Sequence, residues 1–506
     1  MSQKPNLPLA LFGRRGSRHM LVPRGDTLWL ALAPEGAPSM VPTAPRPAGL
    51  FEILVLAEGK PTPYTYSADV AALEIKAPGG GARVTHDAPI RALRVECEGV
   101  SIRFDAKSPA GVSSLNTPDG PVVNIGGGRY VFSARRGKIT FDDTWMLASF
   151  GSVTPVVDVA PVGGIIDLVV YELPGDTPLP AVTRTFDECA EGNAAEYAAF
   201  AKSMVTASTR ASALRDAAAY SLWLNSKELP GGKHCVTPDR ITSQASSPSW
   251  QALASLAFRD FGAVFELLMS LPEASPPLHG LAVTRLLDDG LTGGADAVKL
   301  RELYFALEKT AAWWRDNRTL PGSELSFYAY RFETGHPNPS YFTVGAPVIA
   351  PDLNAYLVLL YDALGRLAAG FGDKETSAKY AGRAEARLAA MLDTLWDGER
   401  FFAVNAYSGE RAEPDGKTCC APFTLNETPV ILGGRLPEDV LSKLADKIDA
   451  ENRFGLGYLT LLSGLASYPG AREKAKKLTL ELLRDAEERT DPVYGAALLA
   501  LASKAI

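Results

Sequence analysis

The feature that most constrains the fold is a change of sequence pattern near Pro180. Before it, short runs rich in Val, Ile, Leu, Phe and Tyr alternate with glycine- and proline-rich turns, which is typical of antiparallel strands. After it, apolar residues recur every three or four positions, which is typical of amphipathic helices. Expected strands include residues 27–33, 49–57, 92–97, 100–104, 129–133 and 164–171. Expected helices are residues 194–204, 208–224, 250–271, 297–314, 353–369, 375–396, 437–448, 457–467, 471–488 and 493–504.

The two patterns predict an α+β protein with two domains. No helical window interrupts the strands before residue 190, so the β part is expected to be an antiparallel β-sandwich rather than a parallel sheet. With 506 residues, the chain exceeds the roughly 250–300 residues at which a single core stops growing. We therefore expect a β-sandwich domain in residues 1–185 and a helical domain that carries the pocket in residues 190–506.

Composition excludes several classes of partner. The net charge of -7 argues against nucleic acid as a partner. No run approaches the ~18 apolar residues of a membrane helix, and the first residues lack a secretory signal pattern, so a cytoplasmic protein without a membrane partner is expected. The five cysteines and five histidines show no disulfide framework or metal-ligand spacing, so we expect no metal and no cofactor. The oligomeric state is left open.

Three stretches carry a resemblance to a known group. The first is residues 350–357 (APDLNAYL), followed by 364–368 (LGRLA) and 395–402 (LWDGERFF). The second runs from residues 220–225 (YSLWLN) to Trp250, and the third is residues 331–337 (RFETGHP). In order and spacing they resemble the six-hairpin glycosidases of the mannosyl-oligosaccharide glucosidase, trehalase and glycogen-debranching kind.

The resemblance implies a fold and an activity. The helical domain would be an (α/α)6 toroid, and the β-sandwich would be the domain that commonly precedes it. The protein would be a glycoside hydrolase that acts on a glucoside or oligosaccharide by an inverting acid/base mechanism. The catalytic motifs depart from the group, because Pro337 stands where the general-acid Asp would be and Gln251 follows Trp250 where an Asp is usual.

Inverting hydrolysis needs a carboxylic acid and a carboxylate base on opposite faces of the sugar. Glu333 is the leading acid, because nearby aromatic residues can desolvate it; the alternative is an ion pair with Arg331 or another basic residue. Glu427 or Asp352 is the expected base. For Asp352, the alternative is a helix cap, since Asp precedes an apolar helix.

The remaining residues expected to contact sugar are Asp239, Arg240, Trp250, Tyr328, Tyr330, Arg331, His336 and Asn354. Two other functions stay open. A polysaccharide lyase or sugar epimerase would use His336 and Tyr330 to move a proton beside a carbonyl or carboxylate. A protein that only binds oligosaccharide would explain the loss of the usual aspartate at Pro337.

Overall fold

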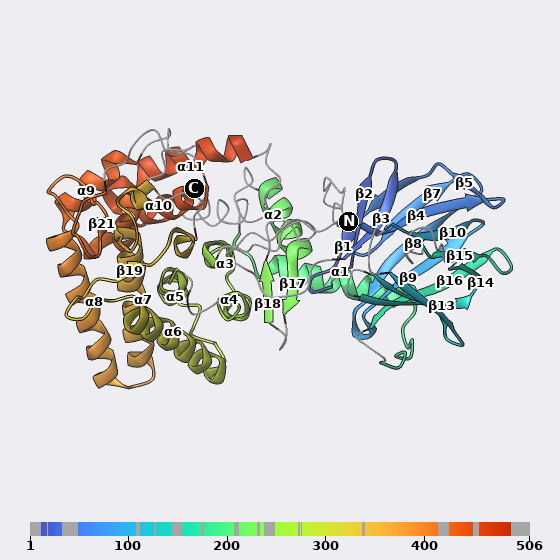
Figure 1. Cartoon of the computed structure of the whole chain (residues 1–506), viewed down its shortest axis with the longest axis horizontal. Coiled ribbons are helices and arrows are strands. Elements are labelled where there is room, and N and C mark those ends of the chain that lie inside the picture. Colours follow the sequence, from blue (N-terminus) through green and yellow to red (C-terminus); the bar gives the residue numbers. More distant parts are fainter. Residues whose placement is uncertain are drawn as a thin grey trace.

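The structure is a computed structural model. It describes residues 12–17, 19–32, 49–107, 112–125, 128–143, 154–173, 177–206, 212–229, 233–236, 248–271, 274, 276–335, 340–412, 425–448 and 455–486. In these ranges a strand-rich part precedes a helical part, as predicted (Figure 1). None of the helices in these ranges has the length and apolarity needed to cross a bilayer.

The strand-rich part is a β-sandwich of two antiparallel sheets. The first sheet has the order β1 (Phe12–Gly13), β2 (His19–Arg24), β3 (Thr27–Leu32), β4 (Gly49–Ala57), β10 (Ser101–Ala106), β15 (Val156–Ala160) and β14 (Lys138–Asp142), with β5 (Lys60–Thr62) paired to β4. The second has the order β11 (Ser113–Thr117), β12 (Gly120–Ile125), β13 (Gly128–Arg136), β16 (Ile165–Leu173), β9 (Ala92–Glu98), β8 (Gly80–Asp87), β7 (Leu73–Ala77) and β6 (Thr65–Ala68). Alternating apolar residues such as Phe51, Phe104 and Phe132 meet between the sheets.

The helical part contains α1 (Phe186–Lys202), α2 (Ser212–Asn225), α3 (Pro248–Ser255), α4 (Phe261–Leu268), α5 (His279–Asp288), α6 (Ala297–Asn317), α7 (Pro351–Gly370), α8 (Lys374–Thr394), α9 (Glu438–Lys447), α10 (Gly455–Ser467) and α11 (Arg472–Ala486). A 3-10 segment, η6 (Leu425–Arg435), precedes α9. The single helix predicted over residues 250–271 is wrong. The Asp260 carboxylate accepts the Ala263 N–H at 2.9 Å, which starts α4 as a separate helix.

Two features of the helical part were not predicted. One is the helix α5; the other is a pair of small antiparallel sheets, formed by β17 (Ser226–Leu229) with β18 (Lys233–Val236) and by β19 (Phe327–Tyr328), β20 (Val348–Ile349) and β21 (Val404–Asn405). The helix predicted over residues 493–504 lies outside the described residues.

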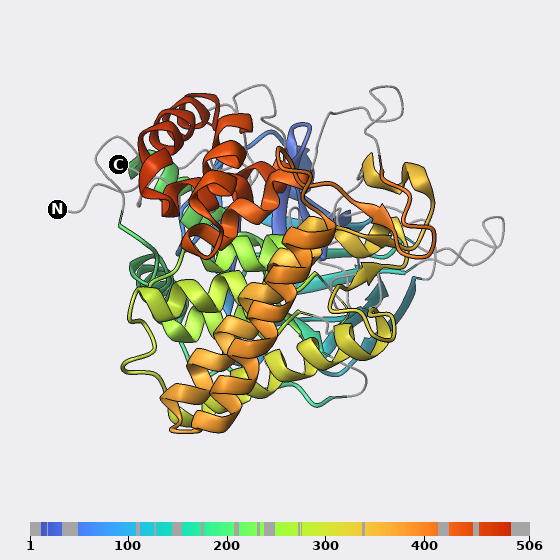
Figure 2. The same ribbon diagram turned by 90° about the vertical axis from the view of Figure 1, so that its left-hand side faces the viewer.

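Helix α7 is an inner helix of the helical domain, and α8 is an outer helix that packs against it. Nearly every residue of α7 is buried, whereas α8 buries only one face. Helix α5 approaches α7 so closely that a Cβ atom on Gly280 would lie 2.3 Å from the backbone nitrogen of Leu360. Helix α10 approaches η6 in the same way at Gly464. Figure 2 views the chain from the helical side, with the helices in front of the strands.

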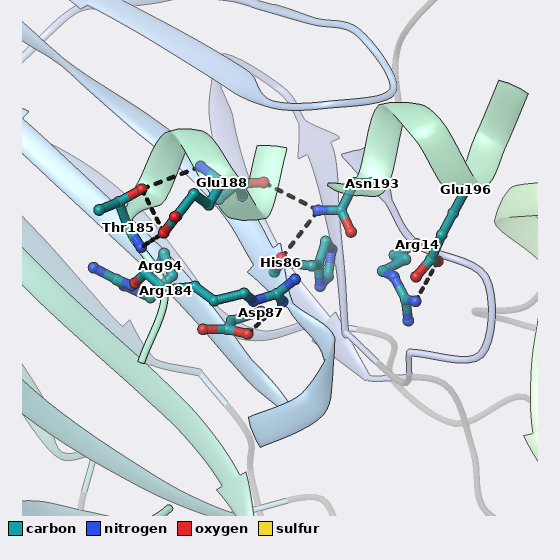
Figure 3. Close-up of polar contacts among 10 residues, drawn as sticks. Arg14, His86, Asp87, Arg94, Arg184, Thr185, Glu188, Asn193 and Glu196 are labelled. Carbon is teal, nitrogen blue, oxygen red and sulfur yellow. Dashed lines mark hydrogen bonds and ion pairs between the residues drawn. The ribbon is translucent and has the colours of Figure 1, made fainter. Parts of the chain in front are cut away.

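Helix α1 joins the two parts. Thr185 and Glu188 form a reciprocal capping box that starts the helix. From its next turns, the buried Asn193 side chain donates to the Thr85 hydroxyl at 3.2 Å and to the His86 carbonyl at 2.9 Å on β8 (Figure 3). Arg14 forms an ion pair with Glu196 on the same helix. Helix α1 therefore connects the sandwich to the helical part by direct hydrogen bonds.

We predict that Asn193→Ala lowers the free energy of unfolding by about 1–3 kcal/mol, because two buried polar groups on β8 lose their partner. Urea denaturation measures this change. Glu191→Ala is the matched control, because Glu191 is exposed on the same helix. An equal loss in the two variants would contradict the role assigned to Asn193.

A second prediction concerns pH and His279, which begins α5 in the core. Burial lowers the pKa of His279 from 6.5 to about 4. The unfolded chain therefore takes up a proton between these pH values that the folded chain does not, and folding loses up to about 3 kcal/mol as pH falls through this window. We expect His279→Phe to remove that part of the pH dependence, measured by urea denaturation across the window.

Asp362 on α7 contributes with the opposite sign. Burial raises its pKa from 3.8 to about 6, against the effect of Arg435. The folded chain then holds a proton that the unfolded chain has released, so this group adds stability as pH falls between these values. Asp362 is present in both proteins, so its contribution cancels when the wild type is compared with His279→Phe. The quantity to compare is therefore the slope of the free energy of unfolding against pH, and equal slopes in the two proteins would contradict the prediction.

Candidate active site

The N-terminal end of α7 brings together three segments that are distant in the sequence. Strand β20 leads directly into α7, and it pairs on one side with β19 and on the other with β21. Val348 pairs with both Tyr328 and Asn405. The small sheet therefore positions the loop after β19, the first turn of α7 and the loop after β21 at one end of the helical domain.

Asp352 lies in the first turn of α7 and is fully buried. Its Oδ2 accepts a hydrogen bond from the hydroxyl of Tyr328 at 3.0 Å. The N-cap residue is Ala350, without a side-chain capping bond, so the alternative that Asp352 caps the helix is wrong. Tyr328 is itself buried, with its ring edge-on to Trp314 at 5.8 Å.

Tyr356, one turn further along α7, connects this end to η6. Burial raises the pKa of Tyr356 well above its usual value, the negative charge of Asp352 adds to the shift, and the nearby Thr428 hydroxyl acts in the opposite direction. Segment η6 packs on α7 and carries Glu427, which is half-buried next to Thr428. Asp352 and Glu427 are therefore brought to the same region from two separate elements.

Asn354 anchors the loop that precedes β19. Its amide nitrogen donates to the carbonyls of Ser326 and Ala350, at 3.0 and 2.9 Å. Its amide oxygen accepts from the Ser326 N–H at 2.9 Å and from Arg387 at 2.6 Å. These four bonds use the full capacity of an amide. Asn354 therefore holds the loop at Ser326, the start of α7 and helix α8 together.

Glu333 lies in a short 3-10 turn, Arg331–Thr334, and is almost completely buried. Its Oε1 accepts from Arg318 Nε at 2.9 Å, and its Oε2 accepts from the Ala329 N–H at 2.6 Å. The ion pair considered from the sequence is therefore present, with Arg318 rather than Arg331 as the partner. Arg331 is exposed and lies 4.9 Å from the centre of the Phe332 ring.

The other predicted residues divide into two groups. Tyr330 is about half-exposed, at 49%, beside the exposed Arg331. Asp239, Arg240 and His336 lie outside the described residues, and so does the side chain of Trp250 in α3. Within the part of the chain that is described, no group of three His, Cys, Asp or Glu residues is placed to hold a metal ion.

Sequence reasoning missed three residues that shape this region: Arg318, Ser326 and Arg387. A signal existed for Arg387, because it follows Tyr380 and Ala384 at helical spacing and so falls on the buried face of α8. Arg318 and Ser326 lie in a loop, where no periodicity marks a buried side chain.

A β-sandwich followed by paired inner and outer helices, with carboxylates at the N-terminal end of an inner helix, defines a class of carbohydrate-active proteins. Residues 269–468 match the family model of the mannosylglycerate hydrolase MGH1-like glycoside hydrolase domain. This range is less than half of the chain, and it contains Glu333, Asp352 and Glu427. No curated protein matches the chain.

Two solved structures share the arrangement of the whole chain. A family GH92 α-mannosidase from Bacteroides thetaiotaomicron in complex with mannoimidazole has a TM-score of 0.54 and 11% identity, covering 99% of this chain and 82% of its own. The GH92 family glycosyl hydrolase ccman5 has a TM-score of 0.51 and 12% identity, covering 100% of this chain and 86% of its own.

These findings confirm the predicted fold class, a β-sandwich followed by an (α/α)6 toroid. They also confirm the predicted resemblance and function at the level of class, because residues 269–468 match a glycoside hydrolase domain.

We predict that Glu333→Gln lowers the free energy of unfolding by about 2–3 kcal/mol, because the half-buried Arg318 loses the buried carboxylate that is its charge partner. Per folded molecule, hydrolysis should stay within a few-fold of wild type. Arg318→Met tests the pair in a double-mutant cycle, in which the two losses should not add. A stable Glu333→Gln variant with turnover reduced by about 10²–10⁴-fold would instead support the general-acid role.

Proposed function

We propose that the substrate pocket of this glycoside hydrolase opens at the N-terminal end of α7. The observation that carries the proposal is the convergence of Asp352, in the first turn of α7, with η6, which bears Glu427 and packs on the same helix. Both residues fall in the range that matches the glycoside hydrolase family model. Long connections join outer to inner helices at this end, and such loops commonly carry binding residues.

The two carboxylates differ in ways that suit different roles. Glu427 is half-buried and can reach water, so we assign it the role of the base that activates water in an inverting reaction. Asp352 is fully buried, accepts a bond from Tyr328 and lies at a helix N-terminus, which favours negative charge. Its charge would stabilise the oxocarbenium-like transition state.

Glu333 would support this site by holding its loop. The ion pair to Arg318 and the bond from the Ala329 N–H fix the turn that leads from β19 to Tyr330 and Arg331. These two exposed residues would then face the sugar, with the arginine offering its fixed fork of donors. The leaving oxygen must also receive a proton from an acid, and Glu333 would donate it only after giving up both contacts.

Similar proteins support a proposal for the substrate class. The family model is that of a mannosylglycerate hydrolase domain, and one protein with a similar fold is an α-mannosidase. We therefore propose α-mannosides as the first class to test, with α-glucosides as the class that the sequence resemblance implies.

Glu427→Gln should lower kcat on the hydrolysed glycoside by roughly 10²–10⁴-fold while KM changes little, because the amide keeps the shape but cannot accept a proton. The measurement uses aryl α-mannosides and α-glucosides, with product anomers followed by NMR; an inverting enzyme releases the β-anomer first. Asp352→Asn should lower kcat as well, since it removes the charge.

Glu410→Gln is the matched control, because Glu410 is an exposed glutamate in the loop after β21. Unchanged turnover in Glu427→Gln would refute the base assignment. Sugar binding without turnover of any glycoside would replace the enzyme proposal by the binding-only alternative. An unsaturated product that absorbs ultraviolet light would favour the lyase alternative.

A further inference from the structure

A cavity of about 490 Å³ lies at the opposite end of α7 from Asp352. Its lining comes from the C-terminal ends of α5, α7 and α10, from the end of η6 and from the start of α8. Asp352 and Arg366 are separated by 14 positions on α7, so the two ends lie about 20 Å apart at the helical rise. None of the residues predicted for the sugar site lines this cavity.

Charged side chains line the cavity in pairs. Asp362 on α7 contacts Arg435 of η6 at 2.5 Å, and Arg366 contacts Asp288 of α5 at 2.8 Å. Arg285 is a further lining residue, paired with Asp289. The lining thus presents carboxylate acceptors and guanidinium donors side by side, fixed by salt bridges rather than left to move freely.

Hydroxyl groups complete the lining. Ser377, Ser463 and Ser467 contribute from α8 and α10, and Thr284 contributes from α5. The Thr284 Oγ1 atom is buried and, within the part of the chain that the structure describes, makes no hydrogen bond. A buried hydroxyl without a partner is uncommon and costs free energy, which indicates that a polar group from outside the chain would find a partner here.

We propose that this cavity is a second binding site, for a small neutral polyhydroxy compound such as a monosaccharide. Each hydroxyl of such a ligand both donates and accepts, and therefore needs the mixture of carboxylates, guanidinium groups and hydroxyls that the lining offers. The volume lies within the range of about 300–1,000 Å³ that is usual for small-molecule sites. Leu281, Leu359 and Ile431 provide apolar surface for the C–H groups of a sugar ring.

A small anion fits the cavity less well. The three lining arginines already contact carboxylates, and Asp288 and Asp362 would repel added negative charge. A neutral polyol can accept from the arginines and donate to the aspartates without breaking these pairs.

The test is isothermal titration calorimetry of mannose and of glucose, with inorganic phosphate as the comparison. Ala381→Trp should block the cavity, because Ala381 is an exposed residue of α8 that lines it. Ala386→Trp is the matched control: it is exposed on the same helix, outside the lining, and about 140° further round. We expect at least one sugar to bind the wild type and Ala386→Trp, and Ala381→Trp to lose at least tenfold in affinity.

Two further measurements separate this site from the proposed active site. Hydrolysis should be unchanged in Ala381→Trp, and sugar binding at the cavity should survive in Asp352→Asn. Asp362→Asn should weaken binding, since it replaces a carboxylate acceptor. The proposal is overturned if neither sugar binds, if Ala381→Trp binds as the wild type does, if only phosphate binds, or if Asp352→Asn abolishes all sugar binding.

Discussion

The buried guanidinium group of Arg387 is the constraint on which the candidate active site depends. It lies on the inner face of α8, where burial lowers its pKa, and it donates to Asn354 and to the Ser326 hydroxyl. A charge in such a place is tolerated only with well-formed partners. These partners belong to α7 and to the loop before β19, so one side chain holds an outer helix, an inner helix and the loop in a single arrangement.

The burial of most of α7 limits where its polar side chains can lie. The first ten residues of α7 are all buried, and α5 packs against the middle of the helix at Gly280. Every polar side chain on α7 therefore needs a partner from another element. Asp352 obtains one from Tyr328 and Asp362 obtains one from Arg435.

Much of the fold was predictable from the sequence, because turn-bounded runs and helical periodicity report directly which faces are buried. The resemblance of residues 350–357 also located the start of α7 and the buried Asp352 within it. The partners of the buried charged side chains were not predictable. Glu333 pairs with Arg318, which lies 15 positions earlier on the far side of a loop, and spacing alone favoured neither it nor Arg331. The break at Asp260 was missed because apolar periodicity continues through it.

The β-sandwich takes part in the structure of the helical domain. Met20, Val22 and Ala31, on β2 and β3, belong to the same buried cluster as the inner helices. The segment between β1 and β2 adds an ion pair from Arg15 to Glu266 and a backbone bond from Gly16 to Ser226. Removing the sandwich would expose the apolar helical residues of this cluster and leave Asn193 without its partners on β8. The helices that line the cavity are therefore stabilised partly by strands of the sandwich, none of whose described residues lines that cavity.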